Sequence, residues 1–344
     1  HAAVTGGSGT QKLTDIANVF DVRLTRYDRK LRKHNYDVEL GIDHYTSASS
    51  DRVDLKANSS ASYADTRIYP SFTWSMENET KGKTISAGVS SSTEYDYLSF
   101  GANIMFSKKT KDKNGEFSAR LQTFIDQVHM IAPEELRGTG TAFDHGNQGR
   151  TTIVGSLSWS QVINKNLQVM LLTDIAHQQG FLSLPFHRVY FADGSVHQGK
   201  LPDSRLKIPV GVRANYFLGD KFIIRTYYRY YKDDWGISSH TLNLEVPVKI
   251  TPFLSISPFY RYYTQSAVDY FAPYGVHTAK DVHYTSNYDL SGFNSNFLGA
   301  GFRVTPSRGI LGIQRLNMLE LRYGHYTKNI NMSANIVSLN LKFK

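Results

Sequence analysis

Apolar and polar residues alternate with a period of two along most of the chain. In residues 205–216, apolar side chains occupy every second position from Leu206 to Tyr216, and polar or small residues lie between them. Such alternation predicts β-strands with one apolar and one polar face. The segments are as long as the roughly 9–11 residues that a tilted strand needs to cross a bilayer. The same pattern recurs in residues 36–44, 67–77, 97–107 and 240–248.

The connections between these segments alternate between short and long. Short turns at one end of the strands and long loops at the other are typical of an outer-membrane barrel, whereas sandwich strands average only about 5–6 residues. The long connections are expected at 46–65, 130–149, 179–204 and 266–289. The strands are expected at 13–27, 34–45, 65–77, 83–91, 95–108, 115–128, 150–163, 166–177, 205–218, 221–232, 237–249, 253–265, 290–305, 315–327 and 331–343.

This set of strands is odd in number, whereas bacterial single-chain barrels have an even number. We therefore predict an all-β fold: a transmembrane antiparallel up-and-down β-barrel of about 16 strands, with the first strand upstream of residue 1. Residues 1–344 are expected to form a single barrel domain. If residues 90–97 join two segments into one strand, the alternative is a barrel of about 14 strands.

The composition agrees with a barrel and restricts other chemistry. No apolar run approaches the roughly 18 residues of a membrane helix. The 22 Tyr and 19 Phe suit the two aromatic girdles at the membrane interfaces. The absence of Cys excludes disulfides and thiolate metal sites. The last alternating segment ends at Phe343, which is typical of the closing strand that the barrel-assembly machinery recognises.

The net charge of +9 raises the possibility of nucleic-acid binding. The basic residues cluster only in 29–33 and 108–111, where turns are expected, so no nucleic-acid partner is predicted. The expected partners are outer-membrane lipids, the barrel-assembly machinery, and other outer-membrane proteins or lipoproteins.

Several short motifs, strongest before Val128, carry a resemblance to a known family. They are His1-Ala2-Ala3-Val4-Thr5-Gly6-Gly7, Glu39-Leu40-Gly41-Ile42-Asp43-His44-Tyr45-Thr46, Ala64-Asp65-Thr66-Arg67-Ile68-Tyr69-Pro70, Glu94-Tyr95-Asp96-Tyr97 and Lys109-Thr110-Lys111-Asp112. The chain resembles an uncharacterised domain-of-unknown-function family of predicted outer-membrane β-barrels of Gram-negative bacteria. The resemblance implies location in the outer membrane. It implies no activity, so no site residue follows from it.

Charged residues in the polar phase of the strands are expected to face the lumen. Acids outnumber bases in the first half of the chain and bases outnumber acids in the second half. Because a closed barrel brings the two halves face to face, we expect a transverse electric field across a water-filled lumen. The predicted lumen-lining residues are Asp37, Glu39, Asp43, Arg120, Asp174, Arg205, Lys207, Arg213, Arg225, Arg229, Arg261, Arg303 and Arg322.

Histidines concentrate at the predicted long-loop end of the strands. Neutral imidazole is a common ligand of zinc and copper, although no pair shows the spacing typical of a metal site. The candidate ligands are His44, His129, His177, His240 and His325. The chain has no Gly-x-Ser-x-Gly, His-Glu-x-x-His or phosphate-loop motif, so no catalytic residue, enzyme activity or cofactor is predicted.

Three functions remain open at this point. The first is a porin-like channel for small, anionic solutes, which the lumen charges favour. The second is a structural or accessory subunit of a larger outer-membrane assembly, secretion or surface-lipoprotein complex, because long outer loops and a charge-balanced lumen suit that role. The third is copper or zinc acquisition through the histidines at the long-loop end.

Overall fold

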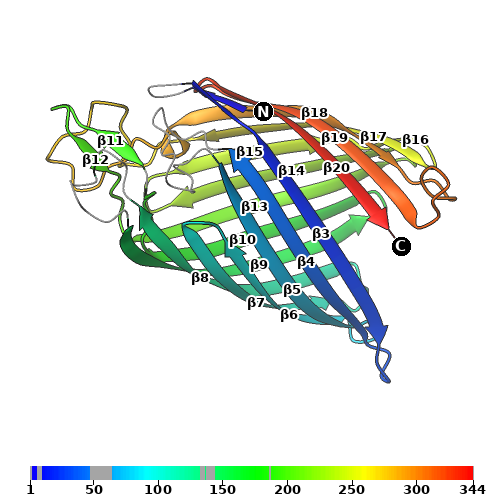
Figure 1. Cartoon of the computed structure of the whole chain (residues 1–344). Helices are drawn as coiled ribbons and strands as arrows, with labels where there is room; N and C mark the ends of the chain where they lie inside the picture. The colour runs from blue at the N-terminus through cyan, green and yellow to red at the C-terminus, as the bar shows by residue number, and fades with distance from the viewer. Residues whose placement is uncertain are drawn as a thin grey trace.

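The computed structural model describes residues 2–5, 10–46, 64–131, 136, 144–185 and 187–343. Within these residues, 18 strands join in one antiparallel sheet that is rolled into a barrel (Figure 1). Two further strands form a small separate hairpin. No helix in the described ranges is long and apolar enough to cross a membrane. The predicted all-β barrel is confirmed.

The wall strands run up and down in chain order. The first nine are β1 (Ala2–Thr5), β2 (Thr10–Leu13), β3 (Asp15–Tyr27), β4 (Lys33–Thr46), β5 (Ala64–Asn78), β6 (Lys83–Thr93), β7 (Tyr97–Lys109), β8 (Gly115–Ile131) and β9 (Asp144–Asn164). The others are β10 (Leu167–Gly180), β13 (Ser204–Leu218), β14 (Phe222–Asp233), β15 (Ser238–Glu245), β16 (Val248–Thr251), β17 (Leu254–Gln265), β18 (Phe293–Val304), β19 (Leu316–Lys328) and β20 (Met332–Phe343).

These 18 strands occupy 16 positions around the wall. Only Thr14 separates β2 from β3, and β15 and β16 both lie between β14 and β17. β1 pairs with β2 and with β20, so it links the two ends of the sheet. β6 and β7 are separate strands, which makes the alternative of about 14 strands wrong. A strand upstream of residue 1 remains a prediction.

The outward phase of the strands is an apolar surface. Ile104, Leu121 and Ile175 lie in one row across β7, β8 and β10, and their exposed fractions are 60%, 52% and 58%. A soluble protein would bury side chains of this size in a core. A continuous exposed row of this kind is the face that a transmembrane barrel presents to hydrocarbon.

The two ends of the barrel differ. The long-loop end carries the connections β8–β9, β10–β13 and β17–β18, and lies at the left of Figure 1 beside the labels β11 and β12. The short-turn end carries β3–β4, β7–β8 and β13–β14. The loops of the long-loop end include β11 (Arg188–Tyr190), β12 (Val196–Gln198) and the 3-10 helix η2 (Tyr288–Leu290).

Several expected strand boundaries were wrong: β8 and β10 end three residues later than expected, at Ile131 and Gly180, and three other differences have a clear physical reason. β9 starts at Asp144 rather than at residue 150, because the residues before 150 pair with the end of β8. The strand expected at 237–249 is interrupted at Val246 and Pro247, since proline has no N–H to donate to a ladder. The strand expected from residue 290 starts at Phe293, because η2 occupies the preceding residues.

Candidate functional site

The inward phase of the wall carries the charged residues that the sequence singles out. In a closed barrel, positions that alternate with the outward apolar ones face the inside. All the predicted lumen-lining residues lie in that phase. Asp37, Glu39 and Asp43 are on β4, Arg120 is on β8 and Asp174 is on β10. Arg205, Lys207 and Arg213 are on β13, Arg225 and Arg229 on β14, Arg261 on β17, Arg303 on β18 and Arg322 on β19.

The inner face of β3 and β4 has an excess of acid. Asp21 pairs in register with Glu39, so two carboxylates lie side by side. In the next row, Arg23 forms an ion pair with Asp37. Like charges directly opposite one another destabilise a sheet unless water or a counter-charge screens them. This wall therefore presents negative charge to the interior.

The inner face of β13 to β17 has the opposite character. Arg213, Tyr227, Asn243 and Arg261 form one row across four strands. The Arg213 guanidinium lies 5.5 Å from the centroid of the Tyr227 ring, and Arg261 Nε donates to Asn243 Oδ1 at 2.7 Å. Within the described ranges, neither arginine has an acid within ion-pair distance. The Tyr227 ring and the Asn243 amide hold the two guanidinium groups in place, but neither group carries a negative charge that would compensate them.

Arg229 adds an unsatisfied donor one row nearer the long-loop end. It pairs in register with Thr241 on β15 and with Gly211 on β13. Arg229 Nε and Thr241 Oγ1 are both buried and have no hydrogen-bond partner in the part of the chain that the structure describes. A buried polar group without a partner is costly, so these atoms are suited to an acceptor that the protein does not supply.

A mixed cluster of charge lies nearer the short-turn end. Arg225 is 3.3 Å from Glu245, and Arg322 is 3.1 Å from the same carboxylate. Arg322 also lies 3.2 Å from Glu320, which Arg303 approaches at 3.5 Å. Arginines outnumber carboxylates in this cluster. The net charge on this side of the wall therefore remains positive even where arginines form ion pairs.

The acidic and basic walls face each other. In a ring of 16 positions, β4 and β14 are eight positions apart, as are β3 and β13. Strands separated by half the ring lie on opposite sides of the lumen. Strands with acidic and with basic inward phases therefore lie on opposite sides of the barrel; the transverse field across a water-filled lumen stays a prediction.

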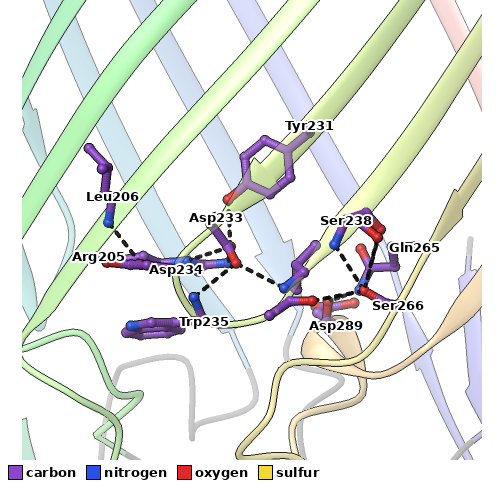
Figure 2. A network of polar contacts seen from close by, with 12 residues as sticks. Arg205, Leu206, Tyr231, Asp233, Asp234, Trp235, Ser238, Gln265, Ser266 and Asp289 are labelled. Atoms are coloured by element: carbon purple, nitrogen blue, oxygen red, sulfur yellow. Dashed lines mark hydrogen bonds and ion pairs between the residues drawn. The ribbon is translucent and has the colours of Figure 1, made fainter.

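At the long-loop end, Asp233 organises the turn between β14 and β15 (Figure 2). Its Oδ2 accepts from Arg205 Nε at 3.0 Å and from Tyr231 Oη at 2.7 Å. Its Oδ1 accepts from the backbone N–H of Trp235 and Ile237 at 3.1 and 2.9 Å. The Arg205 guanidinium lies 4.4 Å from the Trp235 ring centroid. Arg205, predicted only as a lumen charge, is thus also a largely buried ion-pair partner of the buried Asp233.

A small packed cap sits on this turn. Trp235, Ile237 and Val268 form a buried cluster, which joins the β14–β15 turn to the β17–β18 connection. A cavity of about 140 Å³ beside it is lined by His187, Arg205 and Trp235 among others. His187 Nε2 accepts from the Ser286 N–H at 3.1 Å. Burial, together with the nearby charge of Arg188, lowers the pKa of His187 to about 4.

Three carboxylates meet elsewhere at the long-loop end. Asp65 lies near the start of β5, and Glu94 and Asp96 lie in the β6–β7 connection. One oxygen of each side chain lies within 4.8 Å of the others. Burial and the neighbouring carboxylates of Asp65 and Glu94 raise the pKa of Asp96 to about 6. This group was absent from the site predictions, because it joins residues that are distant in sequence.

The five candidate histidines lie in the outward phase, each on a different strand. Each ring has a hydrogen-bond contact of 2.8–3.1 Å with a neighbouring side chain: His44 with Thr66, His129 with Asn147, His177 with Ser204, His240 with Tyr228 and His325 with Asn335. In the described ranges, the only group of three or more potential metal ligands is Asp65, Glu94 and Asp96. The structure therefore does not gather these histidines into one site.

The chain matches a protein family over most of its length. The family is described as "Protein of unknown function (DUF3570)", and the match covers residues 43–335. The chain belongs to the DUF3570 family. This confirms the resemblance to an uncharacterised barrel family. No curated protein matches this DUF3570 chain.

Among solved structures, this DUF3570 protein is similar to outer-membrane receptors. It superposes on a mutant of the ferric enterobactin receptor PfeA from Pseudomonas aeruginosa with a TM-score of 0.52 and 12% identity. It superposes on BauA, the ferric preacinetobactin receptor from Acinetobacter baumannii, with a TM-score of 0.53 and 10% identity. The matches cover 91% and 92% of this chain, and 53% and 54% of the receptors. At these identities the likeness establishes the outer-membrane barrel fold alone.

Proposed function

We propose that this DUF3570 protein forms a water-filled pore in the outer membrane of a Gram-negative bacterium and favours small anionic solutes. A wall with 16 positions supports the proposal, because barrels of about 16–18 strands are wide enough to leave an aqueous channel. In the described ranges, every strand outside the wall belongs to the β11–β12 hairpin of one loop. The described strands thus include no plug inside the barrel.

The observation that carries the proposal is the uncompensated positive charge on the inner wall. Lys207, Arg213, Arg229 and Arg261 have no acid within ion-pair distance among the described residues, and the acidic β3–β4 wall lies opposite. A solute with a negative group would be drawn to the basic side, and its neutral or positive part would face the acidic side. The unsatisfied Arg229 Nε offers such a group a hydrogen bond.

The test is conductance across a planar lipid bilayer that contains the purified chain. Under a salt gradient, the sign of the reversal potential should show that anions carry more current than cations. The preference should weaken as salt rises, because the Debye length falls from about 8 Å at 0.15 M to about 3 Å at 1 M. A barrel that never conducts would refute the pore, and a cation preference would refute the solute class.

A matched pair of variants isolates the wall charge. Arg261→Gln removes one uncompensated charge from the inner wall and should reduce the preference for anions. Lys165→Gln removes one charge from the exposed β9–β10 turn at the short-turn end and should change the preference little. An equal effect of both variants would assign selectivity to the mouth of the barrel instead of its wall.

A second candidate function is that of a subunit in a larger outer-membrane complex. The observation that favours it is a hollow of about 700 Å³ over β6 to β10, whose lining is almost entirely apolar. The hollow forms because the outward positions Ala87, Ala119 and Gly155 carry little or no side chain. Cross-linking from position 119 in native membranes should capture a specific outer-membrane protein if this role holds. Extraction as a lone chain in mild detergent would count against it.

A further inference from the structure

The start of β5 and the β6–β7 connection bring three acids together at the long-loop end, away from the basic wall. Asp65 is at the start of β5, directly after the β4–β5 connection. Glu94 and Asp96 flank Tyr95 in the β6–β7 connection. One carboxylate oxygen from each acid lies within 4.8 Å of the other two. The sheet pairing of β5 with β6 and of β6 with β7 holds these segments side by side.

Burial separates this group from an ordinary solvated acidic patch. Asp65 is 4% exposed and Asp96 is 7% exposed. Asp65 Oδ1 accepts from the Thr66 N–H at 2.7 Å. Its Oδ2 is buried and has no hydrogen-bond partner in the described part of the chain. A buried carboxylate oxygen without a donor is strongly unfavourable, so this atom calls for a positive partner that the described residues do not provide.

The protein groups around the acids supply only part of that positive charge. Tyr45 Oη donates to Glu94 Oε2 at 2.9 Å, and Arg67 Nε lies 3.5 Å from Glu94 Oε1. Arg67 Nε also donates to Ser92 Oγ at 2.9 Å, so its contact with Glu94 is not exclusive. Both named partners contact Glu94. The backbone N–H groups of Thr66 and Tyr95 also act on Asp65, but among the described residues no arginine or lysine lies within ion-pair distance of Asp65 or Asp96.

We propose that Asp65, Glu94 and Asp96 bind a calcium ion at the long-loop end of β5 and β6. Carboxylate oxygens are the ligands of hard cations, and a set without imidazole or thiolate disfavours zinc and copper. Ca–O distances of about 2.3–2.6 Å separate ligands on opposite sides of the ion by roughly 4.6–5.2 Å. Oxygens within 4.8 Å of one another therefore fit the ion, and water can complete its shell.

The proposal does not depend on conduction. The ion would tie the start of β5 to the β6–β7 connection, and so would fix the rim of the barrel beside the β4–β5 loop. A barrel that conducts nothing could still bind calcium, and a conducting barrel could lack the site. Binding and conductance are therefore separate measurements with separate outcomes.

Calorimetry on the full chain in detergent micelles tests the proposal, with calcium chloride titrated after removal of divalent ions by a chelator. We expect one ion per chain, with a dissociation constant of about 10⁻⁴–10⁻³ M, as in extracellular calcium modules. Asp65→Asn and Glu94→Gln should weaken binding by roughly 10–100-fold or abolish it. The matched controls are Asp220→Asn and Glu79→Gln, which change exposed acids in turns at the short-turn end and should bind as the wild type does.

Two results on the wild-type chain keep the test decisive if a variant folds poorly. Calcium should raise the thermal unfolding midpoint above its value in chelator, because an ion that binds only the folded state stabilises it. Equal midpoints with and without calcium would overturn the proposal, as would undiminished calcium binding by Asp65→Asn. Magnesium binding as tight as that of calcium would overturn the assignment to calcium.

Discussion

The two opposing inner walls treat charge in different ways. On β3 to β5, the basic side chains Arg23 and Arg67 are matched to carboxylates, and acids remain in excess. On β13 to β17, Arg213 and Arg261 rest against a ring and an amide and have no acid partner among the described residues. An ion pair with a carboxylate is the simplest way to compensate an arginine on the inner face of the barrel. Arg213 and Arg261 lack such a partner among the described residues, and the proposed anion preference rests on this contrast.

The largest effect is expected from reversing the charge of the basic wall. The double substitution Arg213→Glu with Arg261→Glu should turn the preference for anions into a preference for cations. The two new carboxylates would balance Lys207 and Arg229 on this wall, while the opposite wall stays acidic. The reversal potential under a salt gradient measures the change. Lys165→Glu at the short-turn end serves as the control and should keep the wild-type sign. If the double variant kept that sign, the contrast between the walls would have no role in selectivity.

The next largest effect is expected on stability, where one ion pair from each wall can be compared. In the Arg205–Asp233 pair the side chains are 12% and 0% exposed, whereas in Arg23–Asp37 they are 62% and 22% exposed. Asp233→Asn leaves a buried guanidinium unpaired and should lower the free energy of unfolding by about 3–5 kcal/mol. Asp37→Asn should lower it by about 0–1 kcal/mol. Urea unfolding in micelles measures both, and equal losses would contradict the difference in burial.

A smaller effect is expected from pH at the cap on the basic side. The pKa of His187 falls from its usual 6.5 to about 4, so the folded cap prefers the neutral ring. Between pH 6.5 and 4, the unfolded segment therefore binds more protons than the folded cap. The folded cap is most stable above pH 6.5, and its free energy of unfolding decreases as pH falls toward 4. The hydrogen-exchange protection factors of the 181–203 connection, which are corrected for the intrinsic rate, should fall as pH falls through that window.

The turn at 28–32 is the internal reference for that experiment. The backbone N–H of Arg32 and other hydrogen bonds hold the pKa of Asp28 well below its usual range, so this carboxylate stays ionised throughout the window. Exchange in the turn should therefore change less with pH, apart from the intrinsic rate. His187→Gln should flatten the profile of the 181–203 connection. A profile that persists in this variant would assign the titration to another group.

The strands could be predicted from the sequence because alternation is a local signal. β13 was expected at 205–218 and spans Ser204–Leu218, and β4 was expected at 34–45 and spans Lys33–Thr46. Where pairing overrides local preference, the prediction failed. Asn147 and Gly149 are poor strand formers, yet they continue β9 because His129 and Gln127 at the end of β8 pair with them. The β11–β12 hairpin was missed, although Asp193-Gly194 is a hairpin-turn signal.

The site was only partly accessible from sequence for a related reason. Strand phase alone places Arg213 and Arg261 on the inner face, since the phase follows from alternation. Phase does not reveal which charges find partners. The contacts of Asp233 with Arg205 and of Asp65 with Glu94 join residues 28 and 29 positions apart in the numbering, and they depend on strand register and loop packing. Sequence patterns over one strand carry no information about either.

The lengths of β8 and β9 make the rim of the barrel uneven. β9 has 21 residues and β8 has 17, whereas crossing the bilayer takes roughly 9–11. At about 3.3 Å per residue, the surplus of β9 extends roughly 30 Å along the strand beyond the hydrocarbon. Outer-membrane barrels direct their long loops outward. In that orientation the ends of β8 and β9, together with the β11–β12 hairpin at the same end of the barrel (Figure 1), would reach into the sugar layer of the surface glycolipids, where antibodies and bacteriophages approach the cell.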